Sequence, residues 1–95
     1  MEIGSIVKIT ASDSLDPRGK LFVGKKGVLY EKYVSMGNEK RGRVLVYPAI
    51  EGLYGETCLL SNLEFVEMVP PGIGGAAMSG NVDAILDWLA SGGVR

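Results

Sequence analysis

Two tyrosines and a group of basic side chains are the residues of this chain whose chemistry suits binding. Tyr47 stands before Pro48 and Tyr54 lies in a glycine turn, so we expect both rings at the surface, where aromatic side chains bind peptides. Between residues 18 and 43, eight lysines and arginines accompany two glutamates, a local charge of +6. Such residues contact phosphates or an acidic protein surface. The candidates for nucleic-acid contacts are Lys25, Lys26, Lys40, Arg41 and Arg43.

Both groups also have an ordinary structural interpretation, which stays open at this point. Tyrosines commonly rim a small core, and lysine pairs in turns are commonly only solvated. Tyr30 and Tyr33 differ in parity within one expected strand, so a regular strand would direct them to opposite faces, with one of them in the core.

The chain lacks the side chains that most enzymes use at neutral pH. It has no histidine and a single cysteine, Cys58, which excludes histidine-based metal sites and nucleophiles activated by histidine. Cys58 lies in an apolar strand, where we expect a buried, unreactive thiol. Glu51 and Glu56 flank a turn, but a paired-acid site also needs a substrate cleft. We therefore expect a protein that is not an enzyme, with no catalytic residue, metal, cofactor or small-molecule substrate.

Composition indicates one small globular domain. The 95 residues are 46% apolar and 22% charged, and the net charge of −1 excludes a globally cationic nucleic-acid binder. The N-terminus does not resemble a signal peptide, and no apolar run approaches the roughly 20 residues of a membrane span. We expect a cytoplasmic protein with no membrane span.

The elements that must position these residues fall into three parts. Residues 1–68 alternate β-branched and aromatic runs with glycine turns, which predicts a β domain. Residues 69–78 are rich in proline and glycine and predict a flexible linker. Residues 79–92 predict a short amphipathic helix. The expected strands are residues 4–10, 28–34, 43–47, 56–60 and 64–68, with one helical turn at 61–63.

The expected C-terminal helix should dock on another surface through its apolar face. Asn81 or Ser79 suits its N-cap and Gly92 suits its end. About ten residues are too few for a stable isolated helix, so it must dock. It can pack on its own barrel, reach a partner protein or a second copy through the linker, or lie on a membrane surface, which its acidic polar face disfavours. The residues that would dock are Val82, Ile85, Leu86, Trp88 and Leu89.

Five short strands with a helical turn before the last predict a five-stranded SH3-like barrel, whose closure would remove exposed sheet edges. The stretches Gly4–Ile9 and Val23–Val28 resemble the KOW pattern of strand, loop, basic residue and glycine, with Gly27 at the family's glycine position. Gly4–Ile9 and Arg43–Val66 also resemble a family of small stromal photosystem I proteins that are SH3-like barrels too.

Three functions follow as expectations. The first is a non-enzymatic protein-binding or assembly module that uses Tyr47, Tyr54 and the helix to contact a protein partner or form a homo-oligomer. The KOW resemblance implies an alternative, a nucleic-acid-binding protein that uses the basic loops. The third is a small accessory component of a large enzyme complex.

Overall fold

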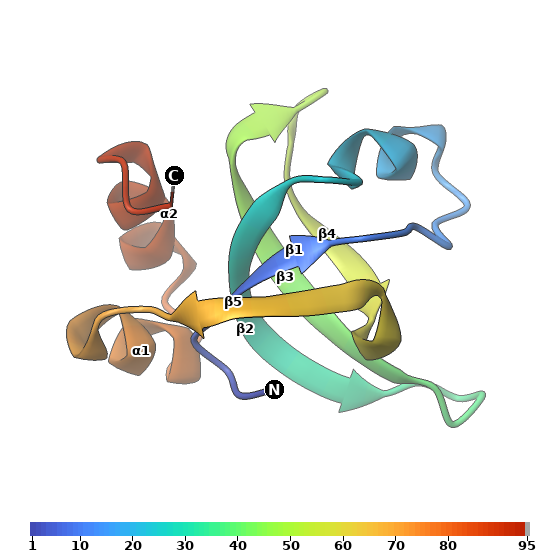
Figure 1. The fold of residues 1–95 in the computed structure, drawn as a ribbon, viewed down its shortest axis with the longest axis horizontal. Helices are drawn as coiled ribbons and strands as arrows, with labels where there is room; N and C mark the ends of the chain where they lie inside the picture. Colours follow the sequence, from blue (N-terminus) through green and yellow to red (C-terminus); the bar gives the residue numbers. More distant parts are fainter. Residues whose placement is uncertain (95) are drawn as a thin grey trace.

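The chain is organised around one antiparallel sheet. The computed structural model describes residues 1–94, and its five strands lie in the order β4-β3-β2-β1-β5 (Figure 1). This order confirms a mainly β fold with five strands. The strands are β1 (Ser5–Ile9), β2 (Lys26–Val34), β3 (Lys40–Ile50), β4 (Leu53–Leu59) and β5 (Leu63–Met68).

Two short 3₁₀ helices lie within the β part. The second, η2 (Leu60–Asn62), is within one residue of the helical turn expected before the last strand. The first, η1 (Pro17–Phe22), was not predicted, because its glycine and turn-forming residues indicated a loop. It begins because the Asp16 side chain accepts a hydrogen bond from the Arg18 amide and proline occupies the first position. Its last residue, Phe22, is fully buried.

The sheet buries apolar side chains on both faces, so the molecule has two cores. This is possible because successive side chains on a strand alternate between faces, as Ile6 and Val7 do. The first core consists of Val7, Ile9, Phe22, Leu29, Val44, Val46, Cys58 and Leu63. The second core consists of Ile6, Val28, Leu45, Val69, Ala77, Ile85 and Leu89.

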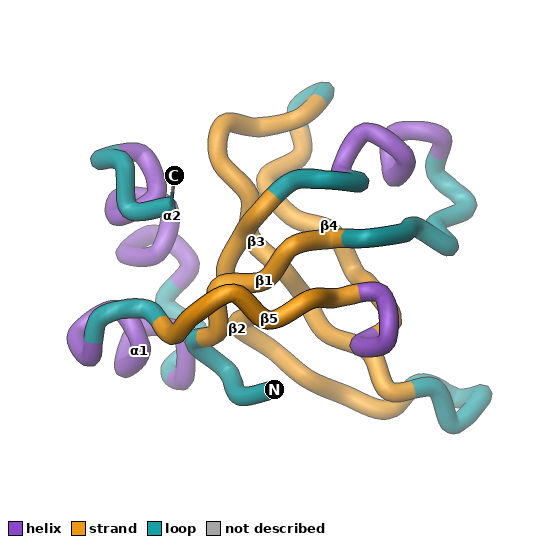
Figure 2. Tube along the Cα trace, viewed as in Figure 1, coloured by secondary structure: helices purple, strands orange, loops and turns teal. Residues whose placement is uncertain are grey.

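The segment predicted to be a flexible linker contains a helix instead. Helix α1 spans Pro71–Met78, and Figure 2 shows it beside the second helix, at the end of the sheet where β5 finishes. Its glycines disfavour a helix, which is why the sequence indicated a linker. Pro71 at the first helical position supports the opposite outcome, and Ala77 is fully buried in the second core. Packing therefore overrides the weak local preference.

Helix α2 (Val82–Ala90) packs on its own sheet, mainly over β3, and also contacts α1. The Asn81 side chain caps it by accepting a hydrogen bond from the Ala84 amide at 3.2 Å, and Gly92 ends it with a φ of 92°. Both features were predicted. Of the three docking modes left open by the sequence, the structure shows packing on the chain's own β domain. Helix α2 covers a sheet face, however, rather than a barrel end.

The predicted closed barrel is wrong, because the sheet remains open. β4 and β5 lie at opposite ends of the strand order and do not pair. The β4 edge is flanked instead by the loop before η1: Ser14 and Asp16 line a hollow together with Glu56 and Thr57 of β4. A short chain can therefore protect an edge with a loop rather than by closure.

Candidate functional site

The β3–β4 hairpin places the two candidate tyrosines. Its turn residues Glu51 and Gly52 both have positive φ values, 50° and 81°, and they connect the paired residues Ile50 and Leu53. A two-residue turn of this kind matches the twist of the flanking strands. The hairpin is therefore closed tightly at its tip, and the residues just behind the tip are held in place.

A large bulge behind the turn brings the two tyrosine rings together. Leu45 pairs with Gly55 and Ile50 pairs with Leu53, so residues 46–49 of β3 stand opposite Tyr54 alone. The Tyr47 and Tyr54 rings stack with centroids 6.3 Å apart and an interplanar angle of 22°. Each residue is still 45% exposed, as the sequence predicted for both. The pair is a preformed aromatic surface, since the rings orient each other before any ligand arrives.

A hollow of about 360 Å³ lies beside Tyr47, and we call it the tyrosine pocket. Three parts of the chain converge there: the turn before β2, the bulged segment of β3, and the end of α2 with the residue stretch after it. A volume of this size lies at the small end of the range for ligand sites. Its lining residues are Gly24, Lys25, Lys26, Val46, Tyr47, Pro48, Leu89 and Val94.

The tyrosine pocket combines apolar side chains with a basic rim. Lys25 and Lys26 are both exposed, and none of the residues lining the pocket is acidic. Val46, Pro48 and Leu89 supply the apolar part. The arrangement suits a ligand that combines an apolar or proline side chain with a carboxylate or another anionic group.

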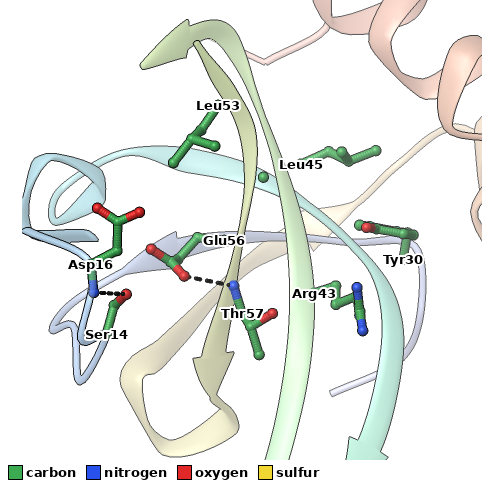
Figure 3. A pocket seen from close by; sticks show the side chains of 9 residues that line it. Ser14, Asp16, Tyr30, Arg43, Leu45, Leu53, Glu56 and Thr57 are labelled. Carbon is green, nitrogen blue, oxygen red and sulfur yellow. Dashed lines mark hydrogen bonds between the residues drawn. The ribbon is translucent and has the colours of Figure 1, made fainter. Parts of the chain in front are cut away.

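A second hollow, of about 340 Å³, lies around β4 and is less suited to a ligand. In the view of Figure 3, Ser14 and Asp16 lie on one side of β4, and Tyr30 and Arg43 lie on the other. The polar groups of this hollow are engaged locally, because Ser14 Oγ accepts from the Asp16 amide at 3.1 Å and Glu56 Oε1 accepts from the Thr57 amide at 2.9 Å.

The carboxylate of Asp16 in this second hollow is held in its ionised form. The side-chain hydrogen bonds from Arg18, joined by the bond from the Arg18 amide, lower the pKa of Asp16 from 3.8 to about 2. An acid this strong is unsuited to proton transfer near neutral pH. Among residues 1–94, no group of three or more Cys, Asp or Glu side chains is arranged to hold a metal ion.

The basic residues predicted for nucleic-acid binding do not gather on one surface. Lys26 begins β2, whereas Lys40 pairs with Val34 at its other end, eight residues on. A straight strand of that length spans about 26 Å at roughly 3.3 Å per residue. The two basic pairs, Lys25–Lys26 and Lys40–Arg41, therefore lie towards opposite ends of the sheet.

Both candidate arginines are engaged by carboxylates. Arg41 donates to both carboxylate oxygens of Asp13 at 2.8 Å, and Arg43 lies 3.2 Å from Glu31. The Arg43 guanidinium also lies 5.7 Å from the centroid of the Tyr33 ring. A phosphate would have to displace these partners, which weakens the case for a phosphate-binding patch.

The helix residues predicted to bind a partner pack within the chain. Ile85 and Leu89 are buried in the second core, and Val82, Leu86 and Trp88 are partly buried against it. Gly93 lies so close to the Trp88 ring that no side chain would fit there. This face of α2 is therefore unavailable to a partner in this conformation, apart from Leu89 at the tyrosine pocket.

Cys58 is buried in the first core, and its environment suppresses thiol chemistry. Burial raises the pKa of the Cys58 thiol to about 12, and the carboxylates of Glu56 and Asp13 add to the rise. At neutral pH the thiol is fully protonated, so it is a poor nucleophile and a poor metal ligand.

The sequence singled out Tyr47, Tyr54, Lys25 and Lys26 as candidates but did not predict that Tyr47 and the two lysines line one hollow. The bulge that turns Tyr47 towards the lysines and the return of α2 depend on tertiary packing. Pro48 was a partial signal, since proline interrupts a strand ladder. Leu89 and Val94 were not linked to this surface, because the helix was expected on the far side of a linker.

Comparison with protein-family models, curated proteins and solved structures finds no match to this chain. In the part of the chain that the structure describes, no helix has the length and apolar character needed to cross a membrane.

Proposed function

We propose that this chain is a non-enzymatic protein-binding module that holds an acidic segment of a partner across the tyrosine pair and in the tyrosine pocket. The observation that carries the proposal is the stacked Tyr47–Tyr54 pair, which stays 45% exposed beside a hollow whose rim is basic. Tyrosine supplies a large contact area with few rotatable bonds, so it loses little entropy on binding.

The chemistry of the pocket defines the ligand. Pro48, Val46 and Leu89 would contact an aliphatic or proline side chain, and Lys25 would attract a carboxylate next to it. The partner segment is therefore short, extended and acidic, with at least one apolar residue.

A nucleic-acid ligand is the rival, and the charge arrangement favours protein. The net charge is −1, Arg41 and Arg43 are paired with carboxylates, and the two basic pairs, Lys25–Lys26 and Lys40–Arg41, lie towards opposite ends of β2. A nucleic-acid groove needs a continuous basic track along the backbone. The tyrosine pocket offers only the neighbouring lysines Lys25 and Lys26, which do not form a continuous basic track.

We also propose that the fold is related to the SH3-like barrels, without their closure. The strand order β4-β3-β2-β1-β5 and the helical turn η2 before β5 support this relationship. Gly27, at the position that the KOW resemblance gives to the family's glycine, packs against the Leu45 carbonyl too closely for any side chain.

The proposal is tested by titrating the ¹⁵N-labelled chain with a panel of synthetic octapeptides built from glutamate, proline and leucine. We expect shift changes at Lys25, Tyr47 and Tyr54, and roughly tenfold weaker binding in Lys25→Glu and Tyr54→Ala, the range of a moderate hot spot. Lys40→Glu makes the same charge change at the far end of β2 and should leave affinity unchanged.

Two results would contradict the proposal. One is an absence of shifts around the hairpin with every acidic peptide. The other is tighter binding of a single-stranded oligonucleotide, weakened by Lys25→Glu and falling steeply with salt, which would establish the nucleic-acid function instead.

A further inference from the structure

Strand β5 forms an open edge of the sheet, at the opposite end of the strand order from β4 of the tyrosine hairpin. Its residues Val66 and Glu67 line a hollow that shares Lys26 and Val94 with the tyrosine pocket. The strand stands last in the order β4-β3-β2-β1-β5 and pairs only with β1 among the described strands. Figure 1 shows it crossing the sheet at the near side of the molecule. Unlike β4, which the loop before η1 flanks, β5 packs chiefly against its single partner strand.

The ladder register shows which backbone groups of β5 face this edge. The Thr10 amide donates to the Asn62 carbonyl at 2.8 Å, so the next pair, Ile9 with Leu63, is non-hydrogen-bonded. The two kinds of pair alternate, which makes Lys8–Glu64 hydrogen-bonded and Val7–Phe65 non-hydrogen-bonded. The amide and carbonyl of Phe65 therefore point away from β1, towards the open edge.

The side chains of β5 are apolar and acidic. Phe65 is 51% exposed, and Val66 and Met68 are exposed as well. The only charged residues of the strand are Glu64 and Glu67. Lysine is a common protective residue on sheet edges, and this strand has none.

We propose that the free edge of β5 binds an extended, basic peptide segment, which adds to the sheet as a sixth strand. Main-chain bonds to Phe65 would supply affinity, and apolar and basic side chains would complement the exposed apolar residues and the two glutamates. This interaction differs from the one proposed for the hairpin, since Phe65 does not line the tyrosine pocket and the two proposals select peptides of opposite charge.

A second copy of the chain fits the same edge less well. Pairing two β5 strands would bring Glu64 and Glu67 of both copies, four carboxylates, onto neighbouring strands. In the antiparallel register that sets Glu64 of one copy opposite Glu67 of the other, like charges stand directly opposite each other and destabilise the ladder. A basic partner peptide removes this repulsion, so charge complementarity favours a basic peptide over a second copy of the chain.

The test uses an acetylated octapeptide of alternating lysine and valine. We expect hydrogen exchange of the Phe65 amide to slow when the peptide binds, whereas the Glu64 amide, already directed at β1, should change little. The same peptide N-methylated at every second residue keeps its charge but cannot form the ladder. We expect it to bind at least tenfold more weakly, from the loss of about two neutral hydrogen bonds.

Matched variants separate the edge from general charge attraction. Glu67→Lys should weaken binding about tenfold, and Asp87→Lys, the same charge change on the exposed side of α2, should not. Equal binding of the N-methylated peptide, equal effects of the two substitutions, slowed exchange in a strand other than β5, or a dimer formed by the peptide-free chain in light scattering would each overturn the proposal. Tyr54→Ala should leave this binding intact.

Discussion

At the scale of single residues, ion pairs organise the loop that follows β1. Asp16, at the end of the loop, pairs with Arg18 of η1 at 2.7 Å, and Asp13 pairs with Arg41, which connects the loop to β3. Arg41 is the more enclosed partner, with its side chain 14% exposed, and both of its terminal nitrogens are bonded to Asp13. A bidentate pair of this kind fixes orientation as well as distance. Arg18 and Arg41 therefore stabilise the fold, and a ligand would have to displace their carboxylate partners.

We predict that Asp13→Asn lowers the free energy of unfolding at neutral pH but not in strong acid. The hydrogen bonds from Arg41 lower the pKa of Asp13 below its ordinary value of 3.8. A lowered folded-state pKa stabilises the protein above the unfolded value and ceases to do so as pH falls through the folded value. Because the Asp13 side chain is 37% exposed, we expect at most about 1 kcal/mol.

Urea unfolding of the unsubstituted chain and of the Asp13→Asn variant, at pH 6.5 and at pH 2.5, measures the difference in their free energies of unfolding. Glu31→Gln is the matched control, because its pair with Arg43 is nearly half exposed on both sides and should contribute little. If Asp13→Asn changed the free energy of unfolding by the same amount at both pH values, the Asp13–Arg41 pair would not account for the stability of the loop.

At the scale of elements, close approach of strands decides where glycine is required. Gly27 in β2 is buried and pairs with Val7, and its φ is not in the left-handed region. A side chain at this position would collide with the carbonyl oxygen of Leu45 and with Val44 Cγ1 at 2.7 Å. The requirement is therefore steric and arises from the neighbouring strand rather than from the local backbone.

We predict that Gly27→Ala destabilises the chain by about 2–3 kcal/mol, the usual range for overpacking, because backbone atoms cannot yield as a flexible side chain can. Gly72→Ala is the control, since a Cβ there meets open space within α1. It should stabilise the chain by about 0.5–1 kcal/mol through helix propensity. Thermal unfolding compares the two variants, and similar melting temperatures would contradict the steric explanation for Gly27.

The elements also show what a sequence of this kind predicts. The strands, the turn η2 and the cap at Asn81 depend on local pattern and were predicted within a few residues. Helix α1 was missed because its stability comes from contact with the sheet, which outweighs its glycines. The exposure of Tyr47 and Tyr54 was predictable from the neighbouring proline and glycines. Their stacking was not, because it depends on a bulge that only tertiary contacts fix.

At the scale of the whole molecule, the helices are part of the domain rather than an appendage. α1 and α2 cover Ile6, Val28 and Leu45 on the sheet face opposite the first core. The sequence predicted a β domain that is complete by residue 68, followed by a flexible linker and a helix whose docking surface it left open. The second core argues against that division, since removal of the helices would expose three buried side chains from the middle of the sheet.

We therefore predict that Ile85→Ala weakens the whole domain, by about 2–4 kcal/mol, because Ile85 is fully buried and its loss leaves a cavity between α2 and the sheet. Asp87→Ala, on the exposed side of the same helix, should change stability by no more than about 0.5 kcal/mol. Chemical unfolding followed by both amide I infrared absorption, which reports the strands, and Trp88 fluorescence, which reports α2, should give coincident transitions shifted together by Ile85→Ala. If fluorescence shifted while the sheet transition stayed in place, α2 would be an independent arm, free to dock elsewhere, and the second core would not hold the domain together.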